Sequence, residues 1–104
     1  MEAEAAAMVM SQRKNLADYA VILSDKDNVA TALVDLPAGD YVLTSDAIKA
    51  VITIPDDITA GFKLALADIG KGEPIYKYGY KIGLATEDIA KGRCVHVHNL
   101  ISSV

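Results

Sequence analysis

The chain has 104 residues, 52% of them apolar, and a formal net charge of −4 at pH 7. This length accommodates one domain with a single modest core, and so large an apolar share excludes an intrinsically disordered chain. The acidic balance argues against nucleic acid and against an anionic membrane surface as partners, because both are bound by clustered Lys and Arg. No apolar run reaches the roughly 20 residues that a membrane-spanning helix requires.

The cysteine content and the first residues bear on the compartment. Cys94 is the one cysteine, so an internal disulfide is excluded and a reducing environment fits. The chain begins Met1-Glu2-Ala3-Glu4, which is acidic where a secretory signal would be basic. We therefore expect a cytoplasmic protein.

Residues 1–18 are predicted to be an N-terminal extension, and residues 19–104 the folded domain. Residues 1–13 are rich in Ala and Met, which favour a helix, but an isolated segment this short is not a stable helix. A frayed extension is the favoured interpretation. A short helix docked on a partner is the alternative.

Short runs rich in β-branched and aromatic residues predict strands along the domain. The segment 29–33 fits either a short strand or a single helical turn, and 79–83 fits a hairpin turn that leads into a further strand. The other predicted strands span residues 19–23, 40–44, 47–54, 62–66, 74–78 and 95–100. Many short strands with Gly-rich corners predict an all-β domain, either barrel-like or irregular.

One pattern, Asp–apolar–x–x–Gly, occurs four times, and a shift of 20 residues aligns the third copy with the fourth. The copies span residues 35–39, 57–61, 68–72 and 88–92. We interpret the pattern as a tight corner that feeds a strand. The Asp is expected to accept hydrogen bonds from the backbone N–H groups just ahead of it, the apolar residue to be buried, and the Gly to adopt a left-handed backbone angle.

The sharpest chemical feature is His96-Val97-His98-Asn99, within the last predicted strand. Residues two apart on a strand share a face, so His96 and His98 would point outward together while Val97 faces the core. Two imidazoles so placed could bind a divalent metal with a further ligand, hydrogen-bond an anionic substrate, or serve as acid and base. The plain alternative is two solvent-facing histidines on the polar side of a strand.

The 20-residue shift also aligns Tyr76 and Tyr78 with His96 and His98. Lys77 alternates with the two tyrosines and should lie on the other face, where only an edge or a bulge keeps it solvated. There it would be either a structural edge charge or a contact for an anion.

Two further candidates give weaker signals. Cys94 has no nucleophile signature around it and is expected to be a small buried residue. Asp56-Asp57 could bind a cation, but a turn with a solvated carboxylate is the commoner arrangement.

Four stretches together resemble a known family. They are residues 27–33 (DNVATAL), 69–79 (IGKGEPIYKYG), 82–89 (IGLATEDI) and 96–100 (HVHNL). In these motifs the chain is similar to the SAF domain of the altronate dehydratase family, which includes altronate and galactarate dehydratases and the sulfolactate sulfo-lyases. The resemblance covers residues 20–101 and implies a β-clip fold.

The resemblance also implies an activity. It implies a metal-dependent carbon–oxygen hydro-lyase that removes water from a small sugar-derived acid, or a relative that removes sulfite. In that family the domain is the N-terminal part of a long chain or a separate small subunit, and most of the catalytic machinery lies in the large lyase subunit. A divalent metal, iron or manganese, is implied at the assembled site. The matching positions are His96 and His98 as metal ligands, and Lys77, Tyr78 and Asn99 as substrate-binding residues.

One departure from the family pattern affects this expectation. Relatives usually carry Gly-His-Lys where this chain has Gly61-Phe62-Lys63. A phenylalanine neither binds a metal nor carries a proton, so any contact made by that histidine is lost here. The rival interpretation is a non-catalytic carbohydrate- or acid-binding or assembly module of the SAF type, and a homo-oligomer is left open.

Overall fold

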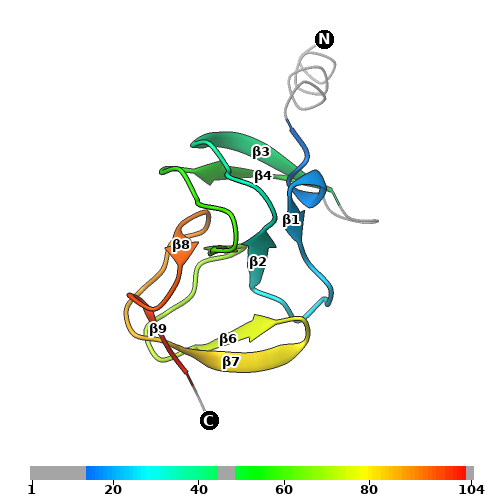
Figure 1. The fold of residues 1–104 in the computed structure, drawn as a ribbon. Helices are drawn as coiled ribbons and strands as arrows, with labels where there is room; N and C mark the ends of the chain where they lie inside the picture. The colour runs from blue at the N-terminus through cyan, green and yellow to red at the C-terminus, as the bar shows by residue number, and fades with distance from the viewer. Residues whose placement is uncertain (1–13, 45–48, 103–104) are drawn as a thin grey trace.

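The structure is a computed structural model that describes residues 14–44 and 49–102 (Figure 1). This part of the chain is all-β, as predicted, and it contains no helix beyond one 3-10 turn, η1 (Leu16–Asp18). The helix considered for residues 1–13 lies outside the described residues. The strands are β1 (Ala20–Val21), β2 (Val29–Ala32), β3 (Gly39–Thr44), β4 (Lys49–Ile54), β5 (Lys63–Ala65), β6 (Pro74–Lys77), β7 (Tyr80–Ala85), β8 (Cys94–Val95) and β9 (Leu100–Ser102).

The strands form three small antiparallel sheets. The central sheet has the order β1-β2-β5-β8, and the other two are β3-β4 and β6-β7-β9. In Figure 1 the β3–β4 ribbon lies at one end of the domain and the β6–β7 hairpin at the other, with β2 between them. Short strands joined by corners in this way fit the predicted β-clip. In the ranges that the structure describes, no helix is long and apolar enough to cross a bilayer.

The predicted strands between residues 19 and 85 are present with two adjustments, and residues 47–48 of the strand predicted over 47–54 lie outside the described residues. The segment 29–33, open between strand and helical turn, is a strand, because residues 29–32 pair with β5 on one side and β1 on the other. The hairpin turn falls at Tyr78-Gly79, between the paired residues Lys77 and Tyr80, and not within 79–83.

The central sheet divides the core into two clusters. Side chains alternate between the two faces of the sheet along β2 and β5, so Ala30 and Leu64 lie on one face and Val29 and Ala65 on the other. The first cluster adds buried residues from η1, β3 and β4, and the second adds buried residues from β6 and β7. Leu16 of η1 is fully buried in the first cluster, so residues before position 19 also pack into the domain.

The four Asp–apolar–x–x–Gly corners meet in two pairs. Leu36 bridges Ile58, and Ile69 bridges Ile89, through reciprocal backbone hydrogen bonds of 2.7–2.8 Å. These four apolar residues are at most 3% exposed, which confirms that each corner is anchored in the core.

The prediction for the aspartates of the corners is wrong about their partners. Asp35 Oδ1 accepts the Ala60 N–H at 2.9 Å, and Asp57 Oδ1 accepts the Ala38 N–H at 2.8 Å, so each carboxylate bonds to the opposite corner. The antiparallel bridge between the two corners explains this, because it brings each Asp alongside the other loop. The prediction for the glycines is confirmed, and Gly61 has a φ of +89°.

Candidate functional site

The loop that carries both histidines is held by Asn99, whose side chain is only 4% exposed. Its Oδ1 accepts the His96 N–H at 2.9 Å, and its Nδ2 donates to the Cys94 carbonyl at 2.9 Å. These bonds satisfy the buried amide within a local turn, so residues 96–99 bend away from β8 instead of extending it. The predicted strand over 95–100 is therefore wrong, and so is the strand alternation that would aim the two imidazoles together.

His96 stacks on Phe62, with ring centroids 4.0 Å apart and ring planes 11° from parallel. The stack continues the ladder between β5 and β8, since Phe62 precedes the paired residue Lys63 and His96 follows its partner Val95. The Nδ1 atom of His96 is buried and has no hydrogen-bond partner. The phenylalanine that departs from the family pattern thus fixes the orientation of one of the two candidate histidines.

His98 lines a shallow hollow with a volume of about 390 Å³. The other lining residues are Asp56, Glu87, Asp88, Ile89, Ala90, Arg93, Cys94 and Asn99. Arg93 and Asp56 form an ion pair of 3.1 Å, but both side chains are more than half exposed, so the pair contributes little to stability. The hollow therefore joins His98 and Asn99 to a mostly acidic surface, and it includes neither Lys77 nor Tyr78.

The described residues 14–44 and 49–102 hold only part of a metal-ligand set. A catalytic zinc or non-haem iron site typically has three protein ligands. Residues 14–44 and 49–102 hold no group of three His, Cys, Asp or Glu side chains placed to bind one ion. His96 and His98 can therefore serve as metal ligands only with ligands from outside this part of the chain.

The tip of the β6–β7 hairpin carries Lys77 and Tyr78. Tyr78 has a φ of +55°, which is uncommon for a residue other than Gly, and Gly79 follows with a φ of +81°. The Lys77 Nζ lies 4.8 Å from the centroid of the Tyr78 ring, in a cation–π contact. The hairpin thus presents an ammonium group and a phenol side by side.

Asp27 and Asn28 anchor this hairpin to the start of β2. Asp27 Oδ1 accepts the Gly79 N–H at 2.7 Å, and Asn28 Oδ1 accepts the Tyr76 N–H at 2.8 Å. Burial raises the pKa of Asp27, but hydrogen bonds from backbone N–H groups, led by Gly79, outweigh it and hold that pKa below its ordinary value. Asp27 therefore stays ionised and keeps the Tyr78 turn in place.

Lys77 lies close to a second lysine, Lys63. On β6, Lys77 shares a side with Ile75, which is buried in the second core cluster. On β5, Lys63 shares a face with Ala65, which belongs to that same cluster. The pKa of Lys63 is lowered, first by burial and then by the positive charge of Lys77. Lys63 and Lys77 therefore lie on the sides of their strands that face the second cluster, near enough for the charge of Lys77 to act on Lys63.

Cys94 is half-buried against the first core cluster, close to the prediction of a small buried residue. Burial raises the pKa of its thiol, and the charge of Lys63 opposes that rise only in part. The thiol is thus held in its protonated form, which makes it a poor nucleophile.

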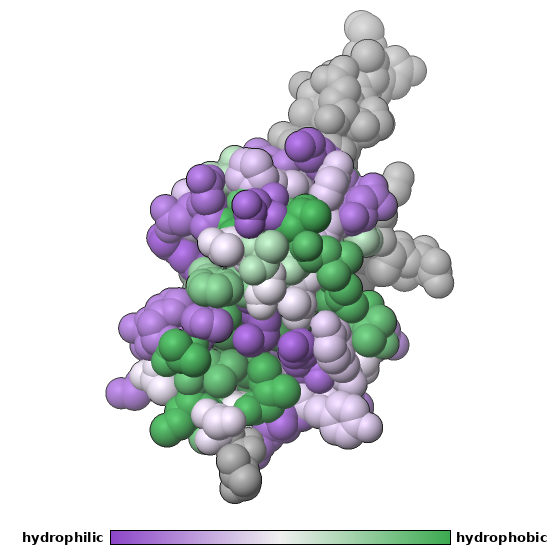
Figure 2. Space-filling model, in the orientation of Figure 1, coloured by the Kyte–Doolittle hydropathy of each residue, from purple (hydrophilic) through white to green (hydrophobic). Residues whose placement is uncertain are grey.

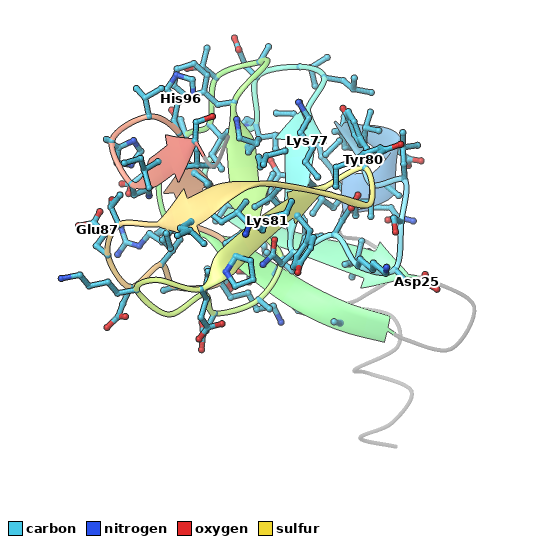
Figure 3. All side chains as sticks on the ribbon, turned by 90° about the horizontal axis from the view of Figure 1, so that it is seen from below. Asp25, Lys77, Tyr80, Lys81, Glu87 and His96 are labelled. Atoms are coloured by element: carbon cyan, nitrogen blue, oxygen red, sulfur yellow. The ribbon has the colours of Figure 1, made fainter. Side chains whose placement is uncertain are left out.

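The structure therefore sorts the predicted site residues into separate groups. Lys77 and Tyr78 are together at the hairpin tip, His98 and Asn99 are together at the hollow, and His96 lies on Phe62. Figure 3 shows Lys77 and His96 on the same side of the β6–β7 hairpin. Lys63 was not predicted as a site residue, although its place between Phe62 and Leu64, which pack toward the first cluster, already put it on the opposite face of β5.

These features define an all-β domain of small antiparallel sheets, with polar side chains grouped at one hairpin and one shallow hollow. The model of the altronate/galactarate dehydratase SAF domain matches residues 18–103, and the chain belongs to this family. This confirms the resemblance found in the sequence motifs.

Two altronate dehydratases and a sulfo-lyase subunit are similar to this chain in sequence. The altronate dehydratase of Escherichia coli (strain K12) is 47% identical over 73 residues, which are 70% of this chain and 14% of that protein. The altronate dehydratase of Bacillus subtilis (strain 168) is 42% identical over 74 residues, again 14% of its length. The chain thus corresponds to about one seventh of these two enzymes. The (2R)-sulfolactate sulfo-lyase subunit alpha of Paracoccus pantotrophus is 38% identical over 58 residues, which are 56% of this chain and 87% of that subunit.

Proposed function

We propose that this chain is the small subunit, or the N-terminal domain, of a metal-dependent lyase that removes water from a sugar acid such as altronate or galactarate. The observation that carries the proposal is the family match over residues 18–103, nearly the whole chain. Similarity to a relative named subunit alpha, most of whose length is covered, supports a large partner chain. The two altronate dehydratases support the hydro-lyase reaction.

In this proposal the chain supplies polar contacts and the partner supplies most of the catalytic groups. Lys77 and Tyr78 are suited to bind a hydroxylated acid, because an ammonium pairs with a carboxylate and a phenol hydrogen-bonds hydroxyl groups. Asn99 is proposed to act at the substrate site through the loop it holds, since its amide already bonds to His96 and Cys94. His96 and His98 are proposed to contact the metal or the substrate in the assembled enzyme.

The reaction class sets what the assembled site must do. Dehydration next to a carboxylate requires removal of the proton on the adjacent carbon and departure of a hydroxyl group as water. A divalent metal, iron or manganese, would stabilise the negative charge that develops. Because the part of the chain that the structure describes holds no complete ligand set, the metal ligands are proposed to come largely from the partner.

Co-expression with a large lyase chain of the altronate dehydratase family, sought in the neighbouring reading frame, tests the proposal. We expect the two chains to co-purify and to convert galactarate or altronate to a 2-keto-3-deoxy acid, which can be measured colorimetrically. The variant carrying His96→Ala and His98→Ala should lose most of this turnover while the lone chain keeps its β-sheet circular dichroism. Full turnover in the folded double variant would refute a role for these histidines.

Two rivals have specific support. Phe62, which replaces the usual histidine and packs on His96, favours a non-catalytic acid-binding or assembly module. The sulfo-lyase relative favours release of sulfite from a sulfonated acid. Sulfite formed from sulfolactate by the two-chain complex would select the second rival. A stable lone chain that captures no partner and supports no turnover would select the first.

A further inference from the structure

We infer that Lys63 and Lys77, together with Thr31, form a binding site for the carboxylate group of a small organic acid. The inference rests on the proposed function only for the choice of acid. The site itself is supported by strand register and by the charges of Lys63 and Lys77.

The three side chains converge because of strand register. Thr31 of β2 pairs with Lys63 of β5, so both side chains leave the same face of the central sheet. This is the face against which Ile75 of β6 packs in the second core cluster. Lys77, two residues beyond Ile75, shares its side of β6, and its positive charge acts on Lys63.

Within the described ranges, the two lysines have no counter-charge and the threonine hydroxyl has no hydrogen-bond partner. Neither Lys63 nor Lys77 takes part in an ion pair among residues 14–44 and 49–102. The Thr31 Oγ1 is buried without a hydrogen-bond partner. A buried hydroxyl is normally satisfied, and two like charges at a half-buried position are unfavourable unless a counter-charge joins them.

Acidic side chains outnumber basic ones in this chain. The chain has 14 Asp and Glu against 10 Lys and Arg, so carboxylates were available to neutralise this pair. The carboxylate of Asp27, which anchors the hairpin to the start of β2, accepts from the Gly79 and Leu23 N–H groups. Within the described residues the two lysines thus have no carboxylate as counter-ion.

A carboxylate suits these three donors. Its two oxygens can accept from both ammonium groups and from the threonine hydroxyl at once. The phenol of Tyr78, next to Lys77, can reach a hydroxyl on the adjoining carbon. Figure 2 shows hydrophilic and apolar areas side by side on one face of the domain.

The test is a titration of the 104-residue chain with galactarate, followed by NMR of the lysine ¹³Cε signals and the Thr31 amide. We expect saturable shifts of Lys63, Lys77 and Thr31, and no such shifts with galactitol, the uncharged polyol of the same carbon skeleton. Lys63→Met and Lys77→Met should each weaken binding by about tenfold or more, which would correspond to loss of one charged contact. Lys71→Met, which removes an exposed lysine, is the matched control and should leave binding unchanged.

Three results would overturn the inference. The first is the absence of shifts at Lys63 and Lys77 with galactarate in excess. The second is an equal response to galactitol, and the third is equal weakening by Lys71→Met, which would mean attraction by net charge alone. Because both methionine variants remove a repulsive charge, they should melt no lower than the unmodified chain, and a thermal melt checks this.

This result is separable from the proposed function. If the two-chain complex turns over while galactarate leaves the lysines unaffected and the methionine variants remain active, the site is refuted and the lyase stands. If the lone chain binds galactarate through the lysines but no partner or turnover is found, the lyase is refuted and the acid-binding site stands.

Discussion

Asp68 and Asp88 each bond to the corner that contains the other. Asp68 Oδ1 accepts the Lys91 N–H at 2.9 Å, and Asp88 Oδ1 accepts the Lys71 N–H at 2.8 Å. The 20-residue repeat is therefore a pair of interlocked turns, and the pair at 35–39 and 57–61 has the same arrangement. Each pair closes one of the two core clusters, since its apolar residues are buried there.

The interlocked turns predict coupled losses of stability. Asp68→Ala and Asp88→Ala should each lower the free energy of unfolding by about 1 kcal/mol, the usual net value of one such hydrogen bond. The double variant should lose less than the sum, by about 0.5 kcal/mol, because either change loosens the shared bridge. Urea denaturation of the four proteins measures this. Strict additivity would show that the two corners are independent, and Asp68→Asn, which keeps the acceptor oxygen, serves as the control.

Two equivalent glycines of these corners should respond differently to alanine. Gly92 and Gly72 have φ values of +89° and +84°, so alanine is strained at both. A Cβ at Gly92 would also collide with the Thr53 carbonyl oxygen, whereas a Cβ at Gly72 meets open space. Gly72→Ala should cost about 1 kcal/mol of stability, and Gly92→Ala about 2–4 kcal/mol. Similar melting temperatures for the two variants would contradict the close approach of Gly92 to β4.

The carboxylate of Asp27 should make hairpin stability depend on pH. Its pKa in the folded chain is below the ordinary value, because backbone N–H donors outweigh burial. The stabilisation is therefore complete above the ordinary Asp pKa of about 3.9 and is lost as the pH falls through the folded-state pKa. The unfolding free energy of the unmodified chain should exceed that of Asp27→Asn at pH 7, and the difference should shrink below about pH 4.

A charge-matched variant separates this effect from the net charge. Asp25 is an exposed neighbour in the same turn, and Asp25→Asn removes the same charge. Its unfolding free energy should follow that of the unmodified chain over the whole pH range. A pH-dependent loss of equal size in Asp25→Asn would contradict the assignment to Asp27.

The two lysines predict a measurable change in a pKa. Burial is the first cause of the lowered pKa of Lys63, and the charge of Lys77 is the second. Lys77→Met should therefore raise the pKa of Lys63 without restoring it fully, since burial remains. Titration of the Lys63 ¹³Cε signal by NMR checks this. An unchanged pKa, or an equal rise in the Lys81→Met control, would show that Lys77 is not close to Lys63.

The lowered pKa of Lys63 also predicts that this lysine destabilises the folded chain at neutral pH. A lysine whose folded-state pKa lies below its unfolded-state value destabilises the fold at neutral pH, because the unfolded chain binds the proton more tightly. Lys63→Met should therefore raise the melting temperature at pH 7. The gain should diminish as the pH rises past the folded-state pKa, where Lys63 in the native chain is already neutral. A variant that melts lower than the unmodified chain at pH 7 would contradict this sign.

Several features of the fold could be predicted from residue patterns. Runs of β-branched residues between Gly and Pro located most strands, and the corner pattern located the buried Ile and Leu residues and the left-handed glycines. These features depend on neighbours in the chain, such as side-chain alternation and allowed backbone angles. The family motifs are likewise runs of neighbouring residues, and they identify the domain without tertiary contacts.

The last strand was mispredicted because a single side chain competes with the sheet. The apolar–polar alternation of Val95 to Leu100 is typical of a strand. The amide of Asn99 instead bonds to the backbone of its own loop, and such local side-chain bonds offer the backbone an alternative to the sheet ladder. No spacing rule distinguishes an Asn that closes a turn from one that ends a strand.

The sequence by itself determined an all-β SAF domain with repeated corners, because strand propensity, glycine angles and family motifs are local properties. Only the tertiary structure decided that each corner aspartate bonds to a different corner, that Phe62 lies on His96, and that the charge of Lys77 acts on Lys63. Those pairs are 14 to 34 positions apart in the sequence, so they depend on how the sheets pack in space, which alternation along one strand does not specify.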